Sequence, residues 1–264
     1  MAPRRHVRAL PVDFEEYLAF GDSSSGDLYP ALDAGATTVA VALERRPAAG
    51  VVAPLGAASL LYRNDDARWP EFAGRDLVTA SPGITFRSFV EDGATIGDVF
   101  GEQLATAQAG DARTLMTLTV GASELMSLLA RRAPAAVTHQ AATDIADAYE
   151  FQVDALRKLR PNSTLVLATV CDPSDGTALL PGVSTATQPV RIEALAMVNE
   201  RIRTLAAGTP GTLLADLHAR FLGHGVSAEA KDRWYWRRSP LDPNARGASE
   251  VRRAWLDALE AGQG

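Results

Sequence analysis

The sequence is poor in cysteine, with one in 264 residues, and it has no excess of basic residues or long hydrophobic run. Because Cys171 is the only cysteine, the chain can form no intramolecular disulfide, which fits a reducing compartment. The net charge of −6 gives no electrostatic footprint for nucleic acid or for an anionic membrane surface. No stretch reaches the roughly 18 apolar residues that a membrane span requires. We therefore expect neither nucleic-acid nor membrane partners.

The first residues contain basic side chains but no uninterrupted apolar segment before Asp13, a pattern that does not fit a secretory signal. We therefore expect a cytoplasmic protein. Apolar residues make up 47% of the chain and charged residues 22%, as in an ordinary globular protein. The length suits one domain over residues 1–264.

Apolar runs alternate with amphipathic patterns along the chain, which predicts strands joined by helical crossovers. The predicted strands are Tyr17–Phe20, Val51–Leu55, Thr85–Phe89, Leu115–Val120, Leu165–Val170 and Leu213–Asp216. The predicted helices are Thr95–Ala107, Leu125–Ala130, Val137–Leu159, Val190–Ala206 and Gly247–Ala261. Crossovers of this kind imply a parallel sheet, so we expect a three-layer α/β/α sandwich.

Residues 28–82, a stretch punctuated by proline and glycine, delay the helix expected after the first strand. We interpret this stretch as an insertion that overhangs the site. It is either a lid or substrate-binding subdomain, or added surface structure.

The stretch YLAFGDSSSGD raises the question of what Ser23 does. A short apolar run ends there in a glycine turn, which places the first hydroxyl at the carboxyl edge of a parallel sheet. Enzymes with α/β folds carry their chemistry at that edge. Ser23 is therefore a candidate nucleophile.

Four motifs resemble, in order, the sequence blocks of the SGNH (GDSL-type) hydrolases: FGDSS at 20–24, DGAT at 92–95, TVGASEL at 119–125, and LDPNARGASEVRRAWLDAL before the chain end. The resemblance spans most of the chain. It implies a flavodoxin-like sheet and hydrolysis or transfer of acyl groups from esters or thioesters. It also implies that Ser23 is the nucleophile and that the N–H groups of Ser23 and Gly93 form an oxyanion hole.

The third block departs from the family pattern, because Ser123 stands where the family has an asparagine that completes the oxyanion hole. A serine hydroxyl can donate a hydrogen bond there but reaches less far than a carboxamide. Glu124 stands where the family has aspartate. Helix capping after a strand is the alternative role for both residues.

The last block departs more, since Ser239 and Asp242 stand where the family has the acid and the histidine of its triad. Imidazole suits the role of base because its pKa lies near neutral pH. Asp242 would be a much weaker base unless burial raised its pKa strongly. Either another residue takes the serine proton, or hydrolysis is impaired.

His218 is a candidate for the missing base, because it follows the last predicted strand and so lies at the same edge of the sheet. Asp216, two residues earlier, could orient its ring as the acid of a triad does. The alternatives are His224 as the base, a hydrogen-bonded structural role for His218, and a metal site with both histidines and Asp216. The metal reading lacks a third ligand with suitable spacing, and we expect no cofactor or metal.

Two further segments allow alternative readings. The loop 171–177 places Asp172 and Asp175 after a strand, where capping of the turn is favoured over a role in the site. The segment 233–238, RWYWRR, suits an anionic or aromatic ligand but equally suits a packed helix with exposed arginines.

Two functions remain from the sequence. The protein is a serine-dependent hydrolase or transferase of a small ester or thioester with an altered base, which we favour. Alternatively, it keeps the fold but binds a ligand or catalyses a non-hydrolytic step. The fold cannot decide between them, and the sequence does not indicate the oligomeric state.

Overall fold

The computed structural model describes residues 10, 12–36, 54–130, 133–180, 188–239 and 241–262, with the backbone alone for residues 129–130 and 188–191. Its centre is a five-stranded parallel sheet with the strand order β2-β1-β3-β4-β5. The strands are β1 (Glu16–Gly21), β2 (Thr85–Ser88), β3 (Thr114–Thr119), β4 (Ser163–Ala168) and β5 (Thr212–Ala215). Five of the six predicted strands are thereby confirmed. Of the predicted strand Val51–Leu55, residues 51–53 lie outside the described part, and residues 54 and 55 are not in a strand.

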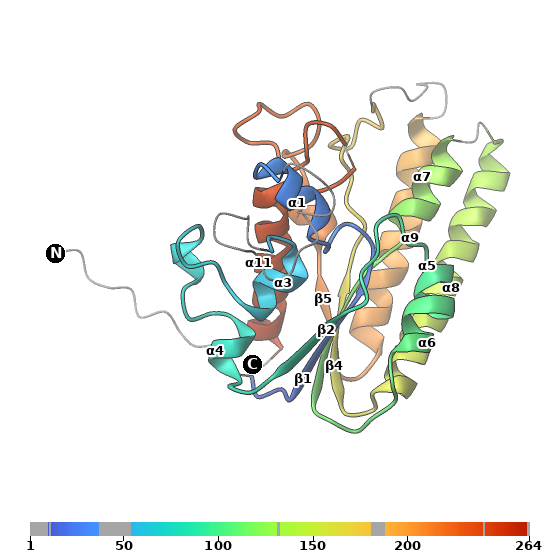
Figure 1. The fold of residues 1–264 in the computed structure, drawn as a ribbon. Helices are drawn as coiled ribbons and strands as arrows, with labels where there is room; N and C mark the ends of the chain where they lie inside the picture. Colours follow the sequence, from blue (N-terminus) through green and yellow to red (C-terminus); the bar gives the residue numbers. More distant parts are fainter. Residues whose placement is uncertain are drawn as a thin grey trace.

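Helices cover both faces of the sheet, as predicted for an α/β/α sandwich (Figure 1). The helical segments are α1 (Leu28–Asp33), α3 (Ala57–Tyr62), η1 (Pro70–Phe72), α4 (Leu77–Ala80), α5 (Ile96–Asp98), η2 (Val99–Gln103), α6 (Leu104–Thr106), α7 (Ala122–Ala130), α8 (Ala135–Leu159), α9 (Gln188–Gly208), α10 (Leu217–Phe221) and α11 (Ala245–Ala261). Among the described residues, no helix combines the length and apolar character needed to cross a membrane.

Alternating residues of β1 show why the sheet has two covered faces. Tyr17 and Ala19 pack into a core with α3, α4 and α11, whereas Leu18 and Phe20 pack into a second core with α8 and α9. All four side chains have no exposed area. Because successive side chains of a strand point to opposite faces, a strand that is apolar throughout must be buried on both.

The predicted insertion at 28–82 contributes to the first of these cores in the part that the structure describes. Ala57, Leu61, Phe72 and Leu77 are fully buried there. Figure 1 shows α3 beside α11 on one side of the sheet. Residues 37–53 lie outside the described part, so whether the segment acts as a lid stays a prediction.

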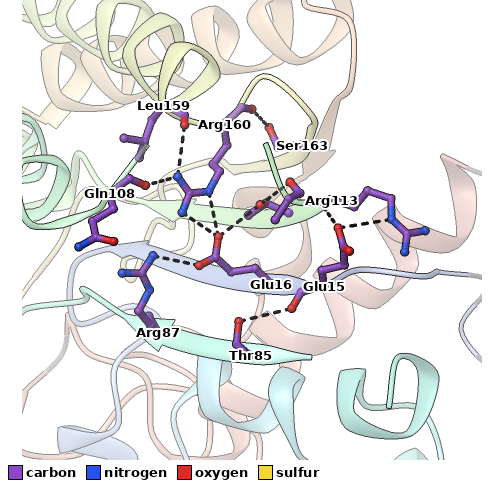
Figure 2. A network of polar contacts seen from close by, with 11 residues as sticks. Glu15, Glu16, Thr85, Arg87, Gln108, Arg113, Leu159, Arg160 and Ser163 are labelled. Atoms are coloured by element: carbon purple, nitrogen blue, oxygen red, sulfur yellow. Dashed lines mark hydrogen bonds and ion pairs between the residues drawn. The ribbon is translucent and has the colours of Figure 1, made fainter. Parts of the chain in front are cut away.

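The amino edge of the sheet is held by an ion-pair network around Glu16, at the start of β1 (Figure 2). Arg160 and Arg87 each approach the Glu16 carboxylate to 2.9 Å. Arg160 also donates to the carbonyls of Gln108 and Leu159. Its side chain is only 4% exposed and that of Glu16 13%. Although burial raises the pKa of Glu16, its hydrogen bonds and charge interactions with the two arginines bring the net pKa below its ordinary value.

Candidate active site

The turn that carries Ser23 depends on Gly21, the last residue of β1. Its φ is +130°, and a Cβ there would lie 1.9 Å from the carbonyl oxygen of Thr119, so only glycine fits. Gln103 binds both polar groups of Gly21, accepting from its N–H and donating to its carbonyl at 2.9 Å each. The strand end is therefore held rigidly where Ser23 begins the turn.

Ser23 is hydrogen-bonded to Asp242, 219 residues later in the chain. Its Oγ donates to Asp242 Oδ1 at 2.6 Å. Ser239 donates to the other carboxylate oxygen, Oδ2. Asp242 lies just before α11, whose N-cap Asn244 accepts from the Gly247 N–H at 2.8 Å. The last sequence block therefore meets the first, and it presents a carboxylate to the serine.

The environment of Asp242 raises the pKa of its carboxyl. The residue is 7% exposed. Burial raises its pKa above the ordinary value near 3.8, the hydrogen bonds from Ser23 and Ser239 partly offset that rise, and the charge of Asp92 adds to it. A carboxylate in this setting is a stronger base than an exposed aspartate.

Ser23 and Gly93, whose N–H groups the motif resemblance assigns to an oxyanion hole, both line the cavity. Gly93 lines the same cavity as Ser23 and has a φ of +72°. Within the described part of the chain, neither the Ser23 N–H nor the Gly93 N–H donates a hydrogen bond. Ser123 also lines the cavity, but its hydroxyl donates to the Gly93 carbonyl at 3.0 Å. This hydrogen bond therefore helps to hold the Gly93 peptide in place.

A cavity of about 450 Å³ opens from Ser23 over the carboxyl ends of the strands. Most of its wall is apolar. The large apolar residues that line it include Leu125, Met126, Val170, Leu180, Leu195 and Leu217. Such a hollow has the volume of an ordinary small-molecule site.

Two further carboxylates are desolvated at this edge of the sheet. Asp22 is 2% exposed and lines the cavity. Burial, together with the charges of Glu124 and Asp242, raises its pKa to about 7 against the hydrogen bonds from Ser24. Glu124 caps α5 by accepting from the Ile96 N–H, and burial raises its pKa as well. The edge thus holds three desolvated acids.

The structure does not bring Asp216 and His218 to Ser23. Asp216 is the N-cap of α10 and binds Arg203, Thr169 Oγ1 and the Ala219 N–H. Burial raises its pKa, but these hydrogen bonds and the arginine charge bring it below the ordinary value. The His218 N–H donates to Thr169 Oγ1 at 2.9 Å, and His218 is not among the described residues that line the cavity.

The remaining histidines have other surroundings. His224 stacks on Trp234 with ring centroids 3.6 Å apart and contacts the Asp232 carbonyl through Nδ1. His139 pairs with Glu193 at 2.8 Å on the helical surface. His6 lies outside the described residues. Within the described chain, no group of three metal-binding side chains comes together.

The loop after β4 has the capping role that the sequence favoured. Asp172 accepts from the Ser174 N–H at 2.9 Å and from the Gly176 N–H at 2.7 Å. Asp175 accepts from the N–H groups of Gly223 and Gly225. These carboxylates order the loop that forms one wall of the cavity.

The aromatic segment 233–238 is not a helix, and it buries Trp234 and Tyr235 while Arg237 and Arg238 are exposed. Trp234 and Tyr235 are 7% and 2% exposed. Trp236 contacts Tyr29 with centroids 5.5 Å apart, and Arg238 lies over its ring at 6.0 Å. The segment leads into Ser239 and Asp242, so its packing places the candidate base.

Sequence reasoning missed two residues that shape the site. Gln103 clamps Gly21, and Asp22 is a buried acid in the cavity wall. Asp22 stands inside a recognised motif, so its place was readable but its burial was not. Nothing local in the sequence marks Gln103, whose partner is 82 residues away.

Comparison with known proteins gives similarity in structure without close similarity in sequence. No protein-family profile matches the chain, and no curated protein sequence matches it. An extracellular lipase from Streptomyces rimosus superposes with a TM-score of 0.62 at 18% identity, over 92% of this chain and 99% of the lipase. A phospholipase A1 from Streptomyces albidoflavus superposes with a TM-score of 0.59 at 17% identity, over 94% of this chain and 99% of the phospholipase.

A protein described as a GDSL-like lipase from Parabacteroides merdae also superposes, with a TM-score of 0.52 at 12% identity over 96% of this chain and 99% of that one. The fold is therefore that of the SGNH (GDSL-type) hydrolases, as the sequence motifs predicted. The structural likeness concerns the architecture alone.

Proposed function

We propose that the protein is a serine-dependent hydrolase or transferase of ester or thioester acyl groups, with Asp242 as the acceptor of the serine proton. The observation that carries the proposal is the hydrogen bond of 2.6 Å from Ser23 Oγ to the buried Asp242 carboxylate. A base must lie within about 2.6 to 3.2 Å of the proton that it removes, and this contact meets that requirement.

In the first half-reaction, Asp242 accepts the proton as Ser23 Oγ bonds to the substrate carbonyl carbon. Negative charge develops on the carbonyl oxygen, towards which the Ser23 and Gly93 N–H groups are free to donate. Loss of such a donor costs about 2.7 to 4 kcal/mol in other hydrolases. Protonated Asp242 then gives its proton to the departing alcohol or thiol, which leaves the acyl group on Ser23.

In the second half-reaction, water or a second alcohol attacks the acyl group, and Asp242 again accepts the proton. Collapse of the intermediate breaks the bond to Ser23 Oγ, which recovers its proton from Asp242. Ser239 holds the carboxylate throughout by its hydrogen bond to Oδ2. Ser239 thus orients Asp242 as a triad acid orients its histidine, but its hydrogen bond lowers the pKa of the base, whereas a triad acid stabilises the protonated base.

One observation favours a second candidate, a binding protein with this fold that has lost acyl transfer. The described residues that line the cavity include no histidine. The two candidates make opposite predictions for the reactivity of Ser23.

A fluorophosphonate probe tests the proposal, because it reacts with activated serines. We expect stoichiometric labelling of Ser23 in the folded protein, and hydrolysis of short p-nitrophenyl esters that Ser23→Ala abolishes. Ser24→Ala, one residue along, and heat-denatured protein are the controls. A folded protein that neither labels nor turns over would support the second candidate.

A further inference from the structure

Apolar side chains form most of the cavity wall beyond Ser23. Leu125 and Met126 of α7 face the cavity together with Val170 after β4 and Leu195 of α9. The apolar lining continues to the mouth, where Leu241 is 38% exposed. We call the part lined by these side chains the apolar lobe.

Several polar groups in the same wall are occupied by the protein itself. Asp172 binds the N–H groups of its own loop. Thr119 Oγ1 is bonded to Ser25 at 2.7 Å, and Thr169 Oγ1 to Asp216 at 2.9 Å. A substrate group in the lobe therefore gains binding energy from burial of apolar surface and little from hydrogen bonds.

The charges around the cavity have one sign. Its described lining includes Asp22, Asp92, Asp172 and Asp242, and no lysine or arginine. A carboxylate or phosphate in the lobe would face these acids without a compensating cation and would lose its water, which is costly. An uncharged group faces neither penalty.

We propose that the apolar lobe binds the acyl chain of the substrate and selects uncharged aliphatic acyl groups longer than acetyl. This inference rests on the proposed function, since it assigns the acyl side of the same reaction. A volume of about 450 Å³ is far more than an acetyl group fills. Each methylene buried in the lobe should raise kcat/KM about fourfold.

Two ester series test the assignment. With p-nitrophenol as the constant leaving group, kcat/KM should rise about fourfold per methylene from acetyl to hexanoyl. With acetyl as the constant acyl group, a longer alcohol should change kcat/KM little. Preference for acetyl, or a rise in the alcohol series instead, would overturn the proposal. The p-nitrophenyl monoester of adipic acid should react at least about tenfold more slowly than the hexanoyl ester, and equal rates would also overturn it.

A matched pair of variants places the effect in the lobe. Met126→Trp fills it and should lower the hexanoyl-to-acetyl ratio of kcat/KM at least about tenfold. Met197→Trp makes the same change on α9 at a residue that is 37% exposed and outside the cavity lining, and should leave the ratio unchanged. If both variants keep the wild-type ratio, the lobe does not hold the acyl chain.

A binding measurement separates this inference from the proposed reaction. Ser23→Ala should bind octanamide more tightly than acetamide by calorimetry, and Met126→Trp in that background should remove the difference. If amide binding depended on acyl-chain length but wild type turned over no ester, the assignment of the lobe would stand and the proposed hydrolase function would be refuted. If wild type turned over esters and binding did not depend on chain length, the hydrolase function would stand and the assignment of the lobe would be refuted.

Discussion

Each end of β1 carries a carboxylate with little exposed area, and the pKa values of the two carboxyl groups are shifted in opposite directions. At the start, Glu16 lies between Arg87 and Arg160, and its pKa falls below the ordinary value. Just after the end, Asp22 is 2% exposed, and burial raises its pKa to about 7. No ion pair is formed by Asp22 within the described residues.

The difference separates charges that stabilise the fold from charges that are available for chemistry. At the amino edge, arginines neutralise Glu16, and the network of Figure 2 joins β1 and β2 to Arg160, the residue that follows α8. At the carboxyl edge, Asp22 and Asp242 are desolvated without a cation, so both hold protons more readily than ordinary aspartates. Perturbed acids of this kind cluster at functional sites.

The largest expected effect on stability comes from Asp22→Asn. Folded Asp22 stays protonated up to about pH 7, whereas the unfolded carboxyl ionises near 3.8. Stability therefore falls as pH rises between these values, and the full cost, at most about 4 kcal/mol, applies above pH 7. Asparagine avoids this cost and can still accept from the Ser24 N–H. Urea unfolding should show that Asp22→Asn has a higher free energy of unfolding than wild type at pH 8, by a difference that shrinks towards pH 4. A difference independent of pH would refute this account.

At the other end of β1, Glu16→Gln should have the opposite effect on stability: it should destabilise the folded protein. The pKa of folded Glu16 is lowered, so its contribution to stability is present above its ordinary pKa and is lost as pH falls through the lowered value. Removal of one partner of such a buried pair should cost about 3 kcal/mol at pH 7. Ester hydrolysis should be retained, because Glu16 lies at the opposite edge of the sheet. If a folded Glu16→Gln variant lost ester hydrolysis, the proposed distinction between the two ends of β1 would be contradicted.

A smaller effect is expected from Ser239→Ala, which removes the hydrogen bond to Asp242 Oδ2. The carboxylate would be held less firmly, and kcat should fall about tenfold. Because that bond lowers the pKa of Asp242, its loss should also move the acid limb of the pH–rate profile to higher pH. Ser239→Thr, which keeps a hydroxyl, should restore both. A profile that does not move would show that Ser239 has no influence on the base.

Most of the sheet was predictable because β1, β3, β4 and β5 are short, largely apolar runs, whereas β2, TFRS, has one large apolar residue. The ends of β1 and β3 could be placed from Gly21 and Gly121. The short helices α1 and α3 were not predicted, since helices of this length are unstable alone and form through packing. Leu60 and Leu61 of α3 are 1% and 0% exposed, in a stretch whose glycines and prolines suggest a loop.

The site was predictable where motifs carried it and unpredictable where burial decided it. Ser23, Gly93 and Asp242 line one cavity, as their order along the chain suggested. His218 does lie at the expected edge, but Asp216 caps α10 and pairs with Arg203, so the predicted dyad does not form. Sequence could not show that Asp242 would be desolvated, because its burial depends on contacts across the whole chain.

The measurement that tests the central claim most directly is the rate at which a fluorophosphonate labels Ser23 in Asp242→Asn and in His218→Ala. If Asp242 takes the serine proton, labelling should slow at least about a hundredfold in Asp242→Asn. It should stay within about twofold of wild type in His218→Ala. Unchanged labelling in Asp242→Asn, or a hundredfold loss in His218→Ala alone, would contradict the account.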